Sequence, residues 1–464
     1  MAPPYCYVDG VDYRCEDARR TSMLGAMLDV GVFGAIATPA FEVFDEEKFI
    51  RHCRAALDAD FPDGRTLHAI ACKTQPTRKI LELAATLGLG CETASYPELV
   101  HALQCGFDPS KIIFDSPSKT RREIEFALEK KVWINADNFS EVDVMQNIID
   151  EKGIDASAVR CGVRINVQTF SASSDVSSIT STSTSKFGVG LKDDPDAILK
   201  VYADHPWLNA IHCHCGSQGV DVDFLASGAA LIMELVNRIN AAREGGQVTH
   251  IDIGGGLKND YISDSTAESF QKYALKVREK VPELWSGKYT VATEFGRAYS
   301  ANSIFSLSFV EYTKNTGGRH IATTHLGADY FLRACYHPHQ WMPKVSCYSK
   351  EGAFMSSDCV ETDVAGPLCF SGDLIVRKKM LPRLSKGDIV MIHDTGAYAM
   401  SMWSRYNSRQ APPTIGVRKC DESSNTNHAV ADLLNGNATI RINGFELFLV
   451  KRGETVADVL RFWE

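Results

Sequence analysis

The sequence has no C-x-x-C pair, although 14 cysteines are scattered over its 464 residues. Closely spaced pairs are typical of zinc sites and of thiol redox motifs, so neither kind of site is expected. The two nearest cysteines flank His214 as Cys213 and Cys215, which is a poor spacing for clamping a metal ion. We therefore predict no metal site, and we expect reduced thiols in a cytoplasmic protein.

Long apolar runs and an excess of positive charge are also absent. The apolar stretch from Met23 to Ala40 is too short to span a membrane and contains Asp29. No basic segment followed by an apolar core opens the chain, so no signal peptide is expected. The formal net charge of −9 argues against nucleic acid or an anionic membrane as a partner.

Short apolar runs instead alternate with amphipathic segments from about residue 43 to residue 310. The predicted strands are Leu67–Ala71, Lys111–Phe114, Val132–Asn135, Arg160–Asn166, Trp207–Cys213, His250–Ile253 and Val291–Thr293. The predicted helices are Asp45–Ala59, Thr77–Leu87, Tyr96–Gln104, Arg121–Lys130, Phe139–Asp150, Asp194–Asp204, Asp221–Ala242 and Ser265–Glu279. This alternation predicts a parallel sheet, and the number of units fits a closed barrel.

The two ends of the chain have a different character. Residues 1–42 are expected to be strand and irregular structure packed on a β-rich domain that covers residues 311–464. The predicted strands of that domain are Val360–Val364, Asp388–His393, Thr414–Val417 and a part of Thr439–Val450. The pairs Asn435-Gly436 and Asn443-Gly444 predict tight turns at both ends of a terminal strand. The Ser/Thr-rich stretch Ser171–Thr184 predicts a surface loop or a mobile lid.

The predicted strand Leu67–Ala71 leads directly to Lys73. A lysine at the end of a buried strand escapes the cost of burying its charge if its pKa falls, and the neutral amine then attacks carbonyl groups. The competing interpretation is a lysine whose ammonium group simply reaches the solvent.

Three further motifs close predicted strands, and each also has a plain structural interpretation. His214 followed by Gly216-Ser217 offers a ring for stacking beside an amide and a hydroxyl for a phosphate. Gly254-Gly255-Gly256 lets the backbone approach an anion, although a tight turn needs the same residues. Glu294-Phe295-Gly296-Arg297 offers a carboxylate for a protonated pyridine nitrogen and an arginine for a phosphate.

The β-rich part adds a thiol and a carboxylate in Gly366-Pro367-Leu368-Cys369-Phe370-Ser371-Gly372-Asp373, and a tyrosine in Gly396-Ala397-Tyr398. In this order the motifs resemble those of the fold-type III pyridoxal-phosphate decarboxylases, the family of ornithine and diaminopimelate decarboxylases. The resemblance runs from about residue 43 to the end. It implies an alanine-racemase-like (β/α)8 TIM barrel followed by a C-terminal β-sandwich or barrel. Ser185–Gly188, Met402–Arg409 and Lys451–Asp458 resemble diaminopimelate decarboxylases in particular.

The resemblance implies a role for each matching residue. Lys73 would hold pyridoxal 5'-phosphate as a Schiff base, His214 would stack on its ring, and Glu294 would keep the pyridine nitrogen protonated. The phosphate would be held by Ser217, Gly254, Gly255, Gly256, Gly296, Arg297 and Tyr398. Glu92 stands where the family usually has an aspartate, and Arg164 would contact the cofactor end of the site. Cys369 would return a proton to the α-carbon across the interface of a homodimer.

Phe370 departs from the pattern, because the family carries an acidic residue after this cysteine to hold a distal ammonium. A phenyl ring cannot neutralise a buried cation. Arg333 lies roughly where diaminopimelate decarboxylases bind a distal carboxylate, with Tyr336 and Asp373 as further substrate contacts. We therefore expect an amino-acid substrate with a distal carboxylate or a bulky group.

Other functions remain open at this point. Carboxynorspermidine decarboxylases also have an apolar residue after the cysteine, so a carboxynorspermidine- or ornithine-type enzyme of polyamine metabolism is one alternative. An amino-acid racemase on the same fold is another, and a non-catalytic binding paralogue is a third. Retention of Lys73, Glu294, Arg297 and Cys369 argues against the third.

Overall fold

The protein is described here by a computed structural model that covers residues 17–169, 179–218, 220–259, 266–338, 341–421, 425–426 and 428–464, with the backbone alone at 266–268. The chain divides into two compact units after Ile50 and again after Tyr299. The barrel unit holds the described residues between these points, and the sheet unit holds residues 17–50 and 300–464. The predicted domain boundaries at residues 42 and 310 remain predictions.

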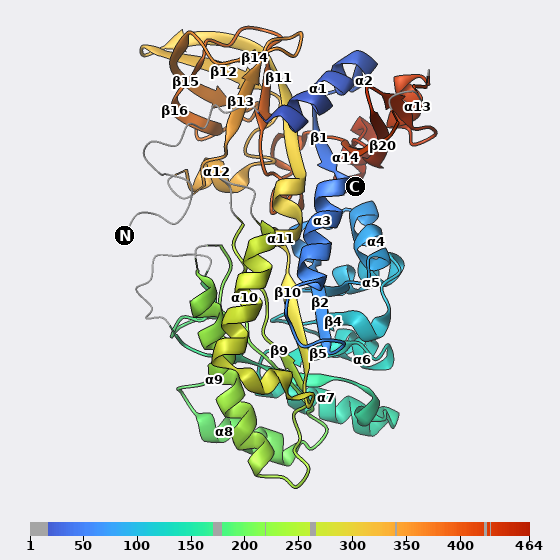
Figure 1. Cartoon of the computed structure of the whole chain (residues 1–464), viewed down its shortest axis with the longest axis vertical. Coiled ribbons are helices and arrows are strands. Elements are labelled where there is room, and N and C mark those ends of the chain that lie inside the picture. Colours follow the sequence, from blue (N-terminus) through green and yellow to red (C-terminus); the bar gives the residue numbers. More distant parts are fainter. Residues whose placement is uncertain are drawn as a thin grey trace. The chain divides into compact units, whose positions relative to one another are not determined.

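Eight parallel strands close a barrel in the barrel unit (Figure 1). They are β2 (Thr66–Ala71), β3 (Gly90–Thr93), β4 (Ile112–Phe114), β5 (Trp133–Ala136), β6 (Cys161–Asn166), β8 (Ala210–His212), β9 (His250–Asp252) and β10 (Thr290–Phe295). Their order around the ring is β2-β3-β4-β5-β6-β8-β9-β10, and β10 pairs with β2 to complete it. A ninth strand, β7 (Val189–Gly190), pairs with β6 outside the ring. The predicted barrel is confirmed.

Helices alternate with the barrel strands along the chain, beginning with α3 before β2, and they surround the strands in Figure 1. They are α3 (Glu46–Leu57), α4 (Arg78–Thr86), α5 (Tyr96–Gln104), α6 (Arg121–Glu129), α7 (Phe139–Lys152), α8 (Pro195–Asp204), α9 (Val222–Ala241), α10 (Thr266–Lys280) and α11 (Arg297–Ser300). Capping side chains fix several starts: Ser95 accepts from the Glu98 amide, and Thr120 and Glu123 form a capping box. The predicted helices are confirmed to within about two residues, as is usual for element ends.

Apolar side chains from several strands fill the inside of the barrel. Ala69, Ile113, Trp133, Ala210 and Ala292 form one buried cluster in which a single indole is surrounded by small residues. This layer packs the inside of the ring as in other barrels of this class. Polar side chains therefore collect at the carboxyl ends of the strands.

The sheet unit contains an eleven-stranded mixed sheet. Its strands are β1 (Ala40–Asp45), β11 (Ile304–Thr316), β12 (Arg319–Thr324), β13 (Val345–Tyr348), β14 (Phe354–Met355), β15 (Cys359–Ala365), β16 (Leu374–Pro382), β17 (Ile389–Ile392), β18 (Thr414–Lys419), β19 (Ile440–Ile442) and β20 (Phe445–Lys451). Its helices are α1 (Ala18–Val30), α2 (Val32–Ala35), α12 (Leu332–Tyr336), α13 (Val430–Leu434) and α14 (Val456–Trp463). The strands expected after residue 311 are confirmed.

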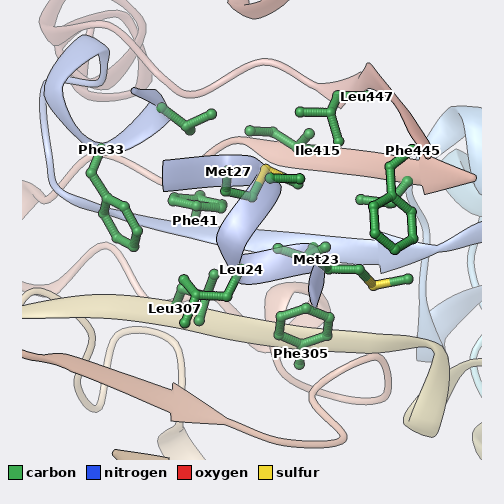
Figure 2. Packing of buried hydrophobic residues seen from close by; sticks show 14 of the residues in the cluster. Met23, Leu24, Met27, Phe33, Phe41, Phe305, Leu307, Ile415, Phe445 and Leu447 are labelled. Atoms are coloured by element: carbon green, nitrogen blue, oxygen red, sulfur yellow. The ribbon is translucent and has the colours of Figure 1, made fainter. Parts of the chain in front are cut away.

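The prediction of strand and irregular structure for residues 1–42 is wrong at α1, and residues 1–16 lie outside the described part. The Asp17 side chain accepts a hydrogen bond from the Arg20 amide and caps the helix, which ends at Gly31. Figure 2 shows Met23 and Met27 of this helix packed with Phe41 and Leu307 in the core of the sheet. Each fully buried side chain of this size contributes about 1.5–3 kcal/mol, so tertiary packing stabilises a helix whose own pattern is weak.

The two Asn-Gly pairs form different turns. Asn443 and Gly444 both have positive φ, as a two-residue hairpin between β19 and β20 requires, so this prediction is confirmed. Asn435 and Gly436 instead end α13, with the Gly436 amide bonded to the Leu433 carbonyl. The expected strand-end turn is therefore a helix end.

Candidate functional site

Lys73 lies in a short 3-10 turn directly after β2, and its ammonium group contacts the carboxylate of Glu92 on β3. The Glu92 side chain is fully buried, while that of Lys73 is 41% exposed. Burial raises the pKa of Glu92 to about 8, and the charge of Lys73 opposes this rise. The lysine that the sequence singled out therefore stands at the open end of the barrel beside a buried carboxyl group.

Glu294 is on β10 and is buried. Its Oε1 atom has no hydrogen-bond partner among the described residues. Burial raises its pKa well above the ordinary value, and the charges of Asp252, Asp115 and Glu92 raise it further. An unsatisfied buried oxygen of this kind is costly unless a ligand supplies a donor.

The three glycines follow β9 and leave no room for side chains. A Cβ atom on Gly255 would lie 2.0 Å from the Glu294 carbonyl oxygen, and one on Gly256 would lie 2.2 Å from the Gly216 carbonyl oxygen. Gly254 and Gly256 also have positive φ. Only glycine permits this close approach of backbones, which forms a concave turn suited to an anion.

His214 follows β8 and lies against this glycine turn. The Gly255 amide donates a hydrogen bond of 3.1 Å to its Nδ1 atom. Burial lowers the pKa of His214 well below the ordinary value, so the ring is neutral. Ser217 lies three residues later in the same loop. Thr180, in the described end of the predicted Ser/Thr-rich loop, donates to the His214 carbonyl, whereas residues 170–178 lie outside the described part.

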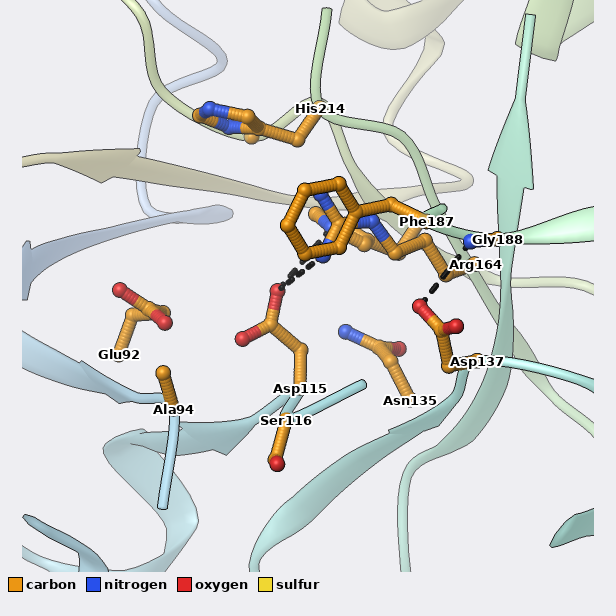
Figure 3. A network of polar contacts seen from close by, with 12 residues as sticks. Glu92, Ala94, Asp115, Ser116, Asn135, Asp137, Arg164, Phe187, Gly188 and His214 are labelled. Carbon is orange, nitrogen blue, oxygen red and sulfur yellow. Dashed lines mark hydrogen bonds and ion pairs between the residues drawn. The ribbon is translucent and has the colours of Figure 1, made fainter. Parts of the chain in front are cut away.

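Arg164 is on β6 and is buried. Its guanidinium lies 3.7 Å from Asp115 and 4.5 Å from the centre of the Phe187 ring. Figure 3 shows Arg164 and Phe187 above Asp115, with Gly188 bonded to Asp137 beside them. The motif that contains Phe187 and Gly188 thus covers the arginine that the sequence placed at the cofactor end of the site.

Gly296 and Arg297 follow Glu294 at the end of β10. A Cβ atom on Gly296 would lie 2.1 Å from the Thr74 hydroxyl, next to Lys73 in the chain. Lys73, Glu92, Arg164, His214, Ser217, the glycine turn, Glu294, Gly296 and Arg297 therefore all lie at or directly after the carboxyl ends of barrel strands. This is the end at which barrels of this class carry their active sites.

Sequence reasoning missed three charged residues at this site: Asp115 after β4, His212 on β8 and Asp252 on β9. The His212 ring nitrogens lie 3.2 Å from Asp115 and 3.1 Å from Asp252. The signal was available, since each residue lies at the carboxyl end of a predicted strand, as Glu294 does.

The remaining predicted residues belong to the sheet unit. Cys369 is exposed in the loop between β15 and β16, where its amide donates to Asn407 and its carbonyl accepts from the Tyr406 hydroxyl. Phe370 stacks on Tyr336 with ring centres 4.8 Å apart. Asp373 is buried and accepts from the amides of Ala328 and Leu368, so its carboxylate holds the shape of this loop.

Arg333 lies in α12 with aromatic rings around its guanidinium. The ring centres of Tyr398 and Trp341 are 4.5 Å and 4.9 Å from it. Tyr398 has a positive φ of 58°, a costly backbone conformation for a non-glycine residue that is common at functional sites.

Among the described residues of both units, no helix is long and apolar enough to cross a membrane.

Comparisons with known proteins agree with this geometry. The profile of the pyridoxal-binding domain of pyridoxal-dependent decarboxylases matches residues 46–301. A diaminopimelate decarboxylase of Helicobacter pylori strain J99 is 30% identical over 383 residues, which cover 82% of this chain and 90% of that protein. A probable chloroplastic diaminopimelate decarboxylase of Oryza sativa subsp. japonica is 29% identical over all of this chain and 86% of its own length.

Solved structures give the same fold. The H. pylori diaminopimelate decarboxylase complexed with L-lysine superposes with a TM-score of 0.75 over 91% of this chain and 96% of that one, at 24% identity. The Selenomonas ruminantium lysine decarboxylase superposes with a TM-score of 0.67 over 86% and 96%, at 23% identity.

The barrel site fits pyridoxal 5'-phosphate on its own geometry. The unpartnered Glu294 oxygen suits a protonated ring nitrogen, and the turn at Gly254–Gly256 suits a phosphate. The neutral His214 ring suits stacking, and Lys73 provides the amine. The fold, the site and the matched profile agree, and the chain belongs to the pyridoxal-dependent decarboxylases as a carboxy-lyase that uses pyridoxal 5'-phosphate.

Proposed function

We propose that this enzyme removes the α-carboxylate of an amino acid whose far end carries a carboxylate or a bulky group, as in diaminopimelate. The observation that carries the proposal is Phe370, stacked on Tyr336 where the family has an acidic residue. Neither ring can neutralise a distal ammonium group. A substrate recognised only by a terminal amine, such as ornithine, therefore lacks its partner here.

Arg333 provides the opposite charge in the same unit. Its guanidinium lies against the rings of Tyr398 and Trp341, which orient it. A fixed guanidinium binds a carboxylate through two parallel hydrogen bonds. Arg333 would therefore bind the distal carboxylate, while Phe370 and Tyr336 would pack against the chain of the substrate.

Each residue of the barrel site has a separate task in this proposal. When bound, the cofactor supplies an electron sink for the negative charge left on the α-carbon as carbon dioxide departs. Lys73 would hold the cofactor, and Glu294 would keep the proton on its ring nitrogen. His214 would stack on the ring, since the Gly255 amide fixes the orientation of its imidazole through Nδ1. Glu92 would hold the Lys73 amine in position.

The phosphate would be held by the backbone amides of Gly256 and Gly296 together with Ser217 and Arg297. The predicted contacts from the Gly254 and Gly255 amides are not available, because these amides donate to Asp252 and His214. Arg297 begins α11, directly after the strand that carries Glu294. Glu294 and Arg297 thus belong to one strand and the turn that follows it, which fixes the distance between their side chains.

Cys369 would return a proton to the α-carbon, and we propose that it comes from the second subunit of a homodimer. Its exposure and its position in a loop held by Asn407, Tyr406 and Asp373 support this. Mixing inactive Lys73→Ala and Cys369→Ala proteins would form hybrid dimers with one intact site and measurable activity. A cytoplasmic location is also proposed, since the described cysteines are free thiols.

Carbon dioxide release tests the substrate. The panel is meso-diaminopimelate, lysine, ornithine, arginine, glutamate and carboxynorspermidine, with the Lys73→Ala protein as the blank. We expect turnover of the acidic candidates and slow turnover of ornithine and lysine. Ornithine or lysine turned over far faster than every acidic candidate would refute the proposal.

Two variants test which residues recognise the distal group of the substrate. Arg333→Met should lower kcat/KM for the best substrate by about 100-fold, since a charged contact is worth about 1.5–3 kcal/mol. Phe370→Glu should raise kcat/KM for lysine. Arg319→Met is the matched control, because Arg319 is on β12 and pairs with Asp363, away from the Cys369 loop in the chain. Equal losses in both arginine variants would contradict the assignment of Arg333.

A further inference from the structure

Three charged side chains form a continuous buried row between strands of the barrel, which we call the ion chain. Asp115 follows β4, His212 ends β8 and Asp252 ends β9, and each is almost completely buried. The two ring nitrogens of His212 each lie close to one carboxylate, at 3.2 Å and 3.1 Å. The histidine is thus enclosed by an acid on either side.

This arrangement favours a cationic ring. Each ring nitrogen lies within 3.2 Å of a carboxylate oxygen, but neither forms a hydrogen bond with a described residue, so the attraction is between charges. Burial alone lowers the pKa of His212, but the charges of Asp252 and Asp115 outweigh it and raise the pKa to about 9. A doubly protonated ring has no lone pair for a metal ion, so the cluster of Asp115, His212 and Glu294 is better explained as an ion network.

Asp252 is fixed by further contacts. Its Oδ1 atom accepts from the Gly254 amide at 2.9 Å, and its Oδ2 atom accepts from the Asn135 side chain at 3.5 Å. Figure 3 shows Asn135 beside Asp115 at this level of the barrel. The ion chain therefore connects the glycine turn to the strand ends on the other side of His212.

The ion chain also reaches Glu294. Polar atoms of Asp115, His212 and Glu294 all lie within 4.8 Å of one another. Each of the two aspartates disfavours a charge on Glu294, and Lys73 favours it. A cationic His212 within 4.8 Å of Glu294 acts in the same direction as Lys73 and lies between the two aspartates.

We propose that His212 is a positioning residue for the cofactor, whose positive charge favours the ionised form of Glu294 that would hold the protonated ring nitrogen. The inference rests on the cofactor chemistry of the family and is independent of the proposed substrate. The other charged or titratable groups that face Glu294 or His212 are Lys73, Glu92, Arg164 and His214. These four groups are kept unchanged in every variant.

Three variants separate charge from packing. His212→Gln removes the cation. His68→Gln is the matched control, because His68 is also buried in a barrel strand, but burial lowers its pKa to about 4 and the ring is neutral. The double variant His212→Gln with Asp115→Asn removes one positive and one negative charge, which restores the balance.

The readout is the dissociation constant of pyridoxal 5'-phosphate, measured by its absorbance and fluorescence as a function of pH. For His212→Gln we expect cofactor binding at pH 7 to weaken by about tenfold or more, since one unit in a partner's pKa corresponds to a factor of ten. The difference from the wild type should vanish above pH 9, where His212 itself loses its proton. The double variant should recover most of the affinity, and His68→Gln should retain it.

Several results would overturn the proposal. Equal weakening in His68→Gln, or an unrecovered double variant, would mean that His212 acts through packing. Stoichiometric binding of Zn²⁺ that is lost in His212→Gln would mean a metal site. If His212→Gln does not fold, folding of the double variant supports the charge role and its failure refutes it. Because no substrate is used, a wrong substrate assignment leaves the test intact.

Discussion

Replacing Gly255 by alanine should separate the glycine turn at Gly254–Gly256 from β10, the strand that carries Glu294. The added Cβ atom would lie 2.0 Å from the Glu294 carbonyl oxygen, whereas an ordinary contact begins at 3.4 Å. The turn and β10 must therefore separate by more than an ångström. That movement stretches the hydrogen bond from the Glu294 amide to the Gly254 carbonyl, which is 2.9 Å long.

The magnitude follows from two contributions. Losing a buried hydrogen bond costs about 1–3 kcal/mol, and overpacking costs a similar amount. The free energy of unfolding of the barrel unit should therefore fall by about 2–6 kcal/mol. Cofactor affinity should fall by at least about tenfold, since the displaced strand carries Glu294 and leads directly to Arg297, two residues that we propose hold the cofactor.

Thermal unfolding and hydrogen exchange of peptides from β9 and β10 measure the first effect, and cofactor titration measures the second. Gly25→Ala is the matched control, because Gly25 lies inside α1 with nothing within 4 Å of its Cβ position. This substitution should stabilise the helix by about 0.5–1 kcal/mol. A Gly255→Ala protein with wild-type melting and wild-type cofactor affinity would refute the reasoning.

Three further predictions concern charge. Lys73→Ala should abolish covalent retention of the cofactor, while the melting temperature of the cofactor-free protein stays close to that of the wild type. A dialysed Lys73→Ala protein that still shows the absorbance of bound cofactor would contradict this. The ion pairs of His212 raise its pKa to about 9 and stabilise the folded protein fully below pH 6.5. The free energy of unfolding of the cofactor-free protein should therefore fall by about 3 kcal/mol as the pH rises from 6.5 to 9, as measured by denaturant unfolding at each pH. The same fall in the His212→Gln protein would exclude His212 as its cause. Arg20→Met should destabilise the sheet unit by about 3–5 kcal/mol, because it removes the 2.7 Å ion pair of Arg20 with buried Asp394. The control Arg19→Met changes a more exposed ion pair and should cost less than a third of that. Thermal unfolding of both variants measures the difference.

The sequence allowed the barrel to be predicted because its elements carry local signals. The capping box at Thr120 and the apolar period of α5 depend only on neighbouring residues. β3 was missed because Gly90 weakens strand propensity and Glu92 interrupts its apolar run. Glu92 is tolerated there because it faces Lys73, which is information that only the folded barrel supplies.

The site was predictable in part for the same reason. Residues that belong to recognisable motifs, such as Lys73 and Glu294, were identified, and they lie where the motifs indicate. The position of Asp115 and His212 at strand ends could be predicted, but their pairing could not, because it joins strands far apart in the sequence. Helix α1 was missed because its stability comes from packing on β1 and β11.

The closure of the ring has a consequence for how the enzyme acquires its cofactor during synthesis. β2 leaves the ribosome early, but its partner β10 follows only after all other barrel strands, as the pairing of Ala69 with Glu294 shows. Contacts so distant in sequence form slowly, and until then both strands have unpaired edges that favour aggregation. Because Lys73 follows one of these strands and Glu294 lies on the other, tight cofactor binding reports that the last seam of the barrel has closed.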